Sequence, residues 1–142
     1  NCMNKAIVDC EVELEVPFFD VDLMEIVWHG HYVKYFEIAR CALLDKIGYG
    51  YMEMRDSGFT WPVIDIRVRY AKAAKFEQKL IIYAGITEWE NRLKINYAIF
   101  DKSTRIRLTH GHTYQVAVNI ITNEMCYESP TILLQKLGVM SH

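Results

Sequence analysis

The chain has 142 residues, of which 51% are hydrophobic and 24% are charged. A globule of this length buries about 70% of its unfolded surface, so residues 1–142 are expected to form one domain with a real core rather than a disordered chain. The net charge of −2 gives no basic footprint, which argues against a nucleic-acid-binding protein.

The four cysteines are widely separated and none lies in the C-x-x-C spacing of a zinc or redox motif. They are Cys2, Cys10, Cys41 and Cys126, and we expect free thiols in a reducing compartment. No apolar run approaches the roughly 18 residues of a membrane span, and the first residues lack the apolar stretch of a signal peptide. A cytoplasmic protein without a membrane span is expected.

The first predicted strand covers residues 8–16, where apolar and acidic residues alternate. This period of two is typical of a strand that is buried on one face. Pro17 ends the strand, and residues 18–29 form an irregular loop rich in aromatic and acidic side chains.

A helix is predicted over residues 30–47, because apolar residues recur at steps of three and four. Further apolar residues leave only a narrow polar stripe, so the helix is expected at the centre of the protein. Gly48 is a plausible helix end. A short helix over residues 51–56 follows, with Gly58 as its break.

Four alternating segments then predict strands over residues 61–70, 80–86, 93–99 and 106–118. The short polar connections between the later segments favour an antiparallel meander. Ser129 and Pro130 predict the start of a last helix that runs through Leu137. With the first strand, these segments predict an α+β protein in which one five-stranded sheet curls around the central helix and covers every apolar face.

The sequence Phe18-Phe19-Asp20-Val21-Asp22, followed by Trp28-His29-Gly30-His31-Tyr32 and later by Ala39-Arg40, resembles the opening of the hydroxybenzoyl-CoA thioesterase family. It is most similar to the acyl-CoA thioesterase branch associated with the bacterial Tol-Pal system. Residues 68–76 and 111–118 are similar to two later strands of the family, so the resemblance covers nearly the whole chain from residue 13 to residue 118.

The resemblance implies a hotdog fold that hydrolyses an acyl-CoA thioester to a free acid and CoA without a cofactor. It also implies a homodimer or homotetramer that binds acyl-CoA at a subunit interface. The second aspartate of the pair, Asp22, corresponds to the family's catalytic carboxylate. The peptide N–H of His29 corresponds to the group that polarises the substrate carbonyl.

The residues themselves suit this chemistry. Thioester hydrolysis builds negative charge on the carbonyl oxygen, and the N–H groups at the start of the predicted helix can stabilise it. Asp22 can serve as a general base or as a nucleophile, and both roles remain open. Asp20 is predicted to be structural. The side chain of His29 either orients a water molecule or acyl group, or is an ordinary hydrogen-bonding residue.

Two sets of side chains are candidates for substrate binding. Aromatic residues can line an acyl pocket or belong to the core, and basic residues can meet the phosphates of CoA or lie on solvated strand faces. The aromatic candidates are Trp28, Tyr32 and Trp61, and the basic candidates are Lys72, Lys75, Arg92 and Lys94.

Three alternatives are kept. The pairs His29/His31 and His110/His112 have metal-ligand spacing, although buried hydrogen-bonded histidines are the preferred interpretation and no metal is expected. A hotdog hydratase would need a different motif before the helix. A catalytically weak acyl-CoA-binding protein is suggested by residues 23–25, which are Leu, Met and Glu where the family has small residues and glycine.

Overall fold

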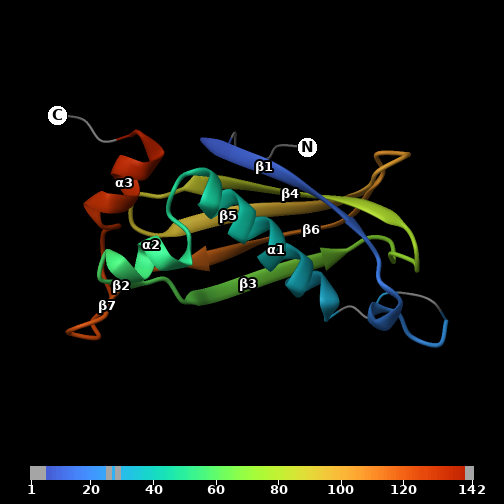
Figure 1. The fold of residues 1–142 in the computed structure, drawn as a ribbon, viewed down its shortest axis with the longest axis horizontal. Helices are drawn as coiled ribbons and strands as arrows, with labels where there is room; N and C mark the ends of the chain where they lie inside the picture. The colour runs from blue at the N-terminus through green and yellow to red at the C-terminus, as the bar shows by residue number, and fades with distance from the viewer. Residues whose placement is uncertain (1–5, 25–26, 28–29, 140–142) are drawn as a thin grey trace.

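The structure is a computed structural model that describes residues 6–24, 27 and 30–139. None of the described helices is long and apolar enough to cross a bilayer. The elements in chain order (Figure 1) are β1 (Val8–Glu15), η1 (Phe18–Asp20), α1 (His31–Lys46), α2 (Tyr51–Asp56), β2 (Phe59–Thr60), β3 (Val63–Tyr70), β4 (Lys79–Glu88), β5 (Leu93–Asp101), β6 (Arg107–Gln115), β7 (Val118–Asn119) and α3 (Thr131–Leu137).

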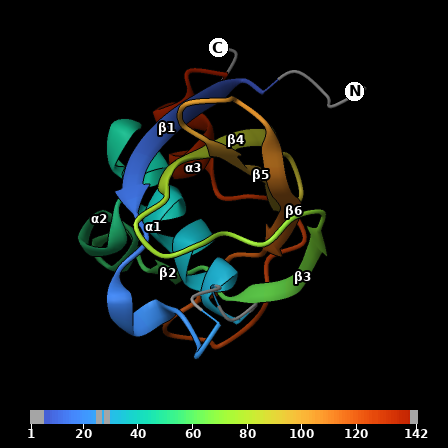
Figure 2. The same ribbon diagram turned by 90° about the vertical axis from the view of Figure 1, so that its right-hand side faces the viewer.

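The main sheet has five antiparallel strands in the order β1-β4-β5-β6-β3. Strands β4, β5 and β6 follow one another in the chain and form a meander. Strand β1 joins the far side of β4, with Val8 opposite Ile86. Seen end-on, the sheet curls around α1 (Figure 2), which confirms the predicted α+β arrangement.

Helix α1 forms the centre of the core because apolar side chains lie on most of its surface. Tyr35, Ala39 and Leu43 are fully buried. Phe36 stacks on Tyr97 of β5, with ring centroids 4.6 Å apart and ring planes at 10°. Burial of a side chain of this size contributes about 1.5–3 kcal/mol, so this contact fixes the helix against the middle of the sheet.

Gly111 allows β6 to lie close to both its neighbour and the helix. A Cβ atom at this position would collide with the carbonyl oxygen of Arg67 on β3 and would lie 3.2 Å from the Phe36 ring. A glycine inside a strand often marks such a close approach. The absence of a side chain here therefore sets the spacing of α1 from this part of the sheet.

The prediction that every apolar strand face is covered is wrong for β3. Ile64, Ile66 and Tyr70 are 54%, 41% and 45% exposed. Strand β3 is the last strand of the sheet beyond β6, and α1 packs mainly against β1 and β4. The apolar face of β3 is thus left open on the side that faces the helix layer.

The single strand predicted over residues 106–118 is also wrong, because the chain leaves the main sheet before it ends. Strand β6 stops at Gln115, and β7 pairs instead with β2, with Phe59 opposite Asn119. This small second sheet lies beside α2 at the end of the molecule where α3 also lies (Figure 1).

The last helix begins one residue later than predicted. Pro130 holds its N-cap position, and the buried Ser129 hydroxyl has no hydrogen-bond partner among the described residues. The predicted Ser129 cap is therefore wrong. The helix ends before Gly138, whose φ of 71° is a left-handed conformation that glycine adopts without strain.

Candidate active site

Asp22 lies on the loop between η1 and α1. Its Oδ1 accepts a hydrogen bond of 2.8 Å from the Met24 backbone N–H, and a bridge between Val21 and Val27 closes the base of the loop. Asp22 is exposed, and the next residue, Leu23, is 104% exposed. The carboxylate therefore lies on a closed loop, next to the apolar side chains of Leu23 and Met24, which are left exposed by the described residues of one copy.

Asp20 connects the same loop to the first turns of α1 through hydrogen bonds. Its two carboxylate oxygens accept hydrogen bonds of 2.7 and 2.8 Å from Lys34 Nζ. The Tyr35 hydroxyl donates to Oδ2 at 2.7 Å, and His31 Nδ1 lies 3.8 Å from Oδ1. Asp20 is only 2% exposed, so this is a buried carboxylate with a nearly complete set of donors.

The electrostatics of this cluster keep Asp20 ionised. Burial alone would raise the Asp20 pKa, but the hydrogen bonds from Lys34 and Tyr35 outweigh it and hold the pKa below its ordinary value. Burial and the Asp20 carboxylate raise the pKa of Tyr35 far above its usual range. Tyr35 is therefore the proton donor in the pair, which agrees with the prediction that Asp20 is structural.

The start of α1 lies directly after the Asp22 loop, with Gly30 at the N-cap position and His31 as the first helical residue. The first N–H groups of any α-helix lack intrahelical partners and carry partial positive charge. Trp28 and His29, two of the predicted site residues, lie outside the described residues.

The connection between β3 and β4 packs against the base of this loop. The Ala74 carbonyl accepts a 2.9 Å hydrogen bond from the Val27 N–H, and the Ala74 N–H donates to the Tyr32 hydroxyl at 2.9 Å. Tyr32 is 2% exposed, which makes it a core residue that orients this connection. Lys72 and Lys75, on either side of Ala74, are exposed and lie at the same end of the molecule as Asp22.

Trp61 lies at the opposite end of α1. Its Nε1–H donates to the Tyr49 hydroxyl at 3.1 Å, and Trp61 is 7% exposed. It lines a cavity of about 700 Å³ between α1, α2, β2 and the end of β6. The other lining residues include apolar Leu44, Met54, Phe59 and Ile120 and polar Arg40, Asp45, Arg55 and Gln115.

Arg92 and Lys94 belong to the Trp61 end as well. Both approach Glu88, at 3.6 and 3.8 Å, and the Arg92 guanidinium lies 3.8 Å from the Tyr114 ring centroid. The neighbouring residue Leu93 pairs with Gln115, near the start of β3.

Within one copy, the structure does not bring the four predicted basic residues together. The length of β3, about 23 Å at 3.3 Å per residue, separates Lys72 and Lys75 at one end from Arg92 and Lys94 at the other. Asp22 and Trp61 also lie at opposite ends of β3.

The histidine pair His110 and His112 lies on the outer face of β6, opposite Arg69 and Arg67 of β3. Burial lowers the pKa of both rings. Arg107 and Arg69 lower that of His110 further, and Lys94 acts in the same direction on His112. The described residues contain no cluster of three or more His, Cys, Asp and Glu that could hold a metal. Both rings are half-buried, less than the sequence suggested.

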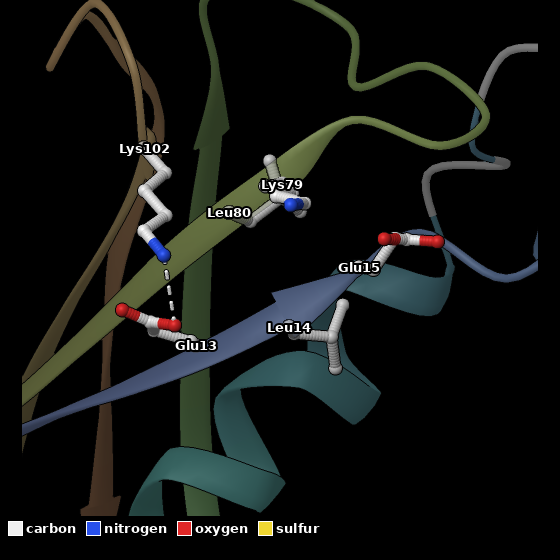
Figure 3. A pocket seen from close by; sticks show the side chains of 6 residues that line it. All are labelled: Glu13, Leu14, Glu15, Lys79, Leu80 and Lys102. Atoms are coloured by element: carbon white, nitrogen blue, oxygen red, sulfur yellow. Dashed lines mark hydrogen bonds and ion pairs between the residues drawn. The ribbon is translucent and has the colours of Figure 1, made fainter.

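A second, smaller hollow of about 180 Å³ lies where β1 and β4 meet. Figure 3 shows Lys102 reaching to Glu13 across it, and the Nζ to Oε2 distance is 3.0 Å. Exposed pairs of this kind contribute little to stability. Lys102 and Glu13 thus pair with each other in this hollow, which adds nothing to the candidate site.

Comparison with known proteins identifies the class. The sequence model of the thioesterase-like superfamily matches residues 16–128, and the chain belongs to this superfamily. The YneP protein of Bacillus subtilis strain 168, provisionally named an acyl-CoA thioesterase, is 28% identical over 70% of this chain and 75% of its own length.

Similar solved structures confirm the hotdog fold. A DHNA-CoA thioesterase from Staphylococcus aureus is 26% identical, with a TM-score of 0.76 over 84% of this chain and 80% of that one. A 1,4-dihydroxy-2-naphthoyl-CoA thioesterase from Synechocystis is 16% identical, with a TM-score of 0.82 over 94% and 98% of the two chains.

The sequence reasoning missed the cavity beside Trp61. Arg40 and Gln115 were both part of segments that resemble the family, yet neither was considered as a site residue. Gln115 offered a usable signal in the sequence. A polar side chain is unusual on the inner face of an interior strand, where apolar side chains are expected. The cavity itself is lined by residues from α1, α2, β2 and β6. No local sequence pattern predicts that these elements lie together.

Proposed function

We propose that the protein hydrolyses an acyl-CoA thioester to a free acid and CoA, with Asp22 as the reacting carboxylate. The single observation that carries the proposal is the position of Asp22 on an exposed loop that Asp20 fastens to the first turns of α1. Relatives named as thioesterases for CoA esters support the substrate class. The narrower Tol-Pal branch and the cytoplasmic location stay predictions.

In the proposed reaction, the carbonyl oxygen of the thioester lies at the start of α1. N–H groups of the first helical turn stabilise the negative charge that develops on this oxygen, and the family resemblance adds the N–H of His29 as a prediction. Asp22 either activates a water molecule or attacks the acyl carbon itself. The thiolate of CoA is a good leaving group, so neither route needs a strong acid.

We further propose that the site is completed by a second copy of the chain. No described strand pairs with the outer edge of β3, and the apolar side chains of Ile64 and Ile66 beside that edge are exposed. Antiparallel pairing of two β3 strands would cover both features. It would also bring the Asp22 end of one copy to the Trp61 end of its partner.

This arrangement reunites the predicted binding residues. Lys72 and Lys75 of one copy would face Arg92 and Lys94 of the other, giving the CoA phosphates a basic surface drawn from both. The acyl group would enter the cavity beside Trp61. A homodimer is therefore the smallest functional unit in this proposal, and a homotetramer would contain two such units.

The catalytic proposal is tested with a panel of short, long and aromatic acyl-CoA esters, by following the release of free thiol. Asp22→Asn is expected to lower kcat by about 10²–10⁴-fold, the usual contribution of a general base. Glu11→Gln removes an exposed carboxylate from β1, at the opposite edge of the sheet from β3, and serves as the matched control. Equal turnover by wild type and Asp22→Asn would contradict the assigned role.

The two-copy site is tested by complementation. Each site consists of the Asp22 loop of one copy and the cavity beside Trp61 of the other. Asp22→Asn inactivates the first part, and Met54→Trp fills the cavity of the second part. Each homodimer is expected to be inactive, whereas co-expression with two different purification tags yields mixed dimers that contain one intact site. If both parts came from the same chain, no mixed dimer would recover turnover.

Leu23 supports one alternative, a protein that binds acyl-CoA with little catalysis. A large exposed side chain directly after Asp22 would crowd a thioester that binds beside this carboxylate. Acyl-CoA binding without turnover across the whole panel would favour this alternative. A Leu23→Gly variant that gains turnover would identify the crowding as its cause.

A further inference from the structure

Two adjacent apolar side chains of the Asp22 loop are exposed to water. Leu23 is 104% exposed and Met24 is 77% exposed. The loop has a defined shape, because the Met24 N–H donates to Asp22 Oδ1 and the bridge between Val21 and Val27 closes its base. Large apolar side chains that lie side by side on a folded surface commonly mark a place that another molecule covers.

The cavity beside Trp61 has an exposed apolar rim. Tyr51 and Ile120 line this cavity and are 76% and 45% exposed. Met54, another lining residue, is only 8% exposed. Apolar surface therefore continues from the buried part of the cavity to its outer edge, and the described residues of one copy leave that edge uncovered.

The charges of the loop and the cavity are complementary. The cavity lining contains two arginines, Arg40 and Arg55, and one aspartate, Asp45, so its net charge is positive. Asp22 adds a carboxylate directly before Leu23. Opposite charges on two facing surfaces fix their orientation and disfavour wrong partners. An apolar pair beside a carboxylate thus suits an apolar cavity with a positive wall.

A second copy of the chain is the partner that brings these two surfaces together. The base of the Asp22 loop is hydrogen-bonded to Ala74, which follows the end of β3, whereas Trp61 precedes the start of β3. In the proposed dimer, with two β3 strands paired antiparallel, the loop of each copy lies at the cavity of the other. The second copy therefore supplies both an apolar cover and a carboxylate.

We propose that Leu23 and Met24 of each copy pack against Tyr51 and Ile120 of the partner subunit, and that Leu23 makes the site selective against acyl groups that are branched next to the thioester. This inference rests on the proposed function, in which the cavity receives the acyl group. Leu23 directly follows Asp22, so its side chain borders the first carbons of an acyl group whose thioester lies at that carboxylate. A methyl branch on those carbons meets the leucine side chain.

The contact between copies is tested without any substrate. Met24 is replaced by the photoreactive residue p-benzoylphenylalanine, and adducts between two chains are mapped by mass spectrometry. They are expected in the peptides that contain Tyr51 or Ile120. The control places the same residue at Ile106, which is 45% exposed in the β5–β6 connection and does not line the cavity, and it should label neither peptide. Adducts within one chain only, or at other segments of a second chain, would overturn the inference.

The strength of the contact is tested by dimer dissociation. Leu23→Ala is expected to keep the fold, because Leu23 is fully exposed in one copy. It should raise the dissociation constant of the dimer by about tenfold or more, measured by sedimentation equilibrium. Ile106→Ala is the matched control and should leave the constant unchanged. An equal dissociation constant for wild type and Leu23→Ala would contradict the proposed contact.

The selectivity is tested with two isomeric esters, butanoyl-CoA and 2-methylpropanoyl-CoA. Wild type is expected to prefer the straight chain, and Leu23→Ala should lower this preference in kcat/KM by about tenfold. Ile106→Ala should keep it. Because the ratio is taken within one variant, it is insensitive to the fraction of protein that is dimeric. An unchanged ratio, or an equal gain for both esters, would overturn the role of Leu23 while leaving the proposed hydrolysis intact.

The inference can also be tested if neither ester is hydrolysed. Calorimetric titration of both esters into wild type and Leu23→Ala then gives the same ratio from binding. A binding ratio that falls in Leu23→Ala, without turnover, would contradict the proposed hydrolysis and support the role of Leu23. Equal binding of the two esters by wild type, or no binding of either, would overturn that role.

Discussion

Replacement of Asp20 by alanine should destabilise the protein through the groups that it leaves behind. Tyr35 is fully buried, and its hydroxyl loses its acceptor, which costs about 1–3 kcal/mol. The Lys34 side chain is 43% exposed, so its ammonium group can be hydrated by water instead. Loss of the Lys34–Asp20 ion pair therefore adds about 1 kcal/mol at most. Together these give a decrease of about 1–4 kcal/mol in the free energy of unfolding.

The Tyr35→Phe variant separates the two contributions. In wild type it should cost about 1 kcal/mol, the net value of one hydrogen bond. In the Asp20→Ala background it should be neutral or stabilising, because it removes a hydroxyl that no longer has a partner. Urea unfolding of all four proteins, followed by circular dichroism at one fixed protein concentration, measures the cycle. Strictly additive losses would refute the assigned pairing.

The pH dependence provides an independent check. The Asp20 pKa is lowered in the folded protein, so ionised Asp20 stabilises the fold above the ordinary aspartate pKa near 4. This contribution is lost as the pH falls through the lower folded value. Wild type should therefore lose stability below about pH 4 more steeply than Asp20→Asn, and parallel curves would contradict this explanation.

Three further predictions concern the core. Phe36→Ala removes the ring that stacks on Tyr97 and should cost about 3–5 kcal/mol; a loss below 1 kcal/mol in urea unfolding would mean that the α1–β5 contact is not central. Gly111→Ala should lower the melting temperature, because the new methyl group meets the Arg67 carbonyl oxygen; an unchanged value would show that β3 moves aside freely. Thr109→Val removes a buried hydroxyl without a partner among the described residues and should raise stability by about 1 kcal/mol; a fall of that size in calorimetry would reveal an unrecognised hydrogen bond.

Much of the fold could be predicted from the sequence because its patterns are local. The alternation of apolar and acidic residues in 8–16 predicted β1, and the apolar residues of 30–47 predicted a central α1. The same alternation misled for β3, where Ile64 and Ile66 read like residues of a covered strand. Periodicity reports which side chains share a face, but it does not report whether another element covers that face.

The candidate site could be predicted only in part, for a related reason. Asp22 was found through its resemblance to a family motif. The hydrogen bonds of Asp20 to Lys34 and Tyr35 depend on the loop turning back onto α1, and the cavity at Gln115 depends on four elements meeting. Such contacts join residues that are distant in the chain, so neither composition nor spacing could reveal them.

The strand order also constrains how the chain can acquire its structure during synthesis. Strand β1 and the apolar helix α1 leave the ribosome before their packing partner β4, which is made only after β3. Contacts between such distant segments form slowly, and apolar segments that wait for a partner are prone to aggregate. Lower growth temperature or added chaperones should therefore increase the yield of folded protein more than a stronger promoter would.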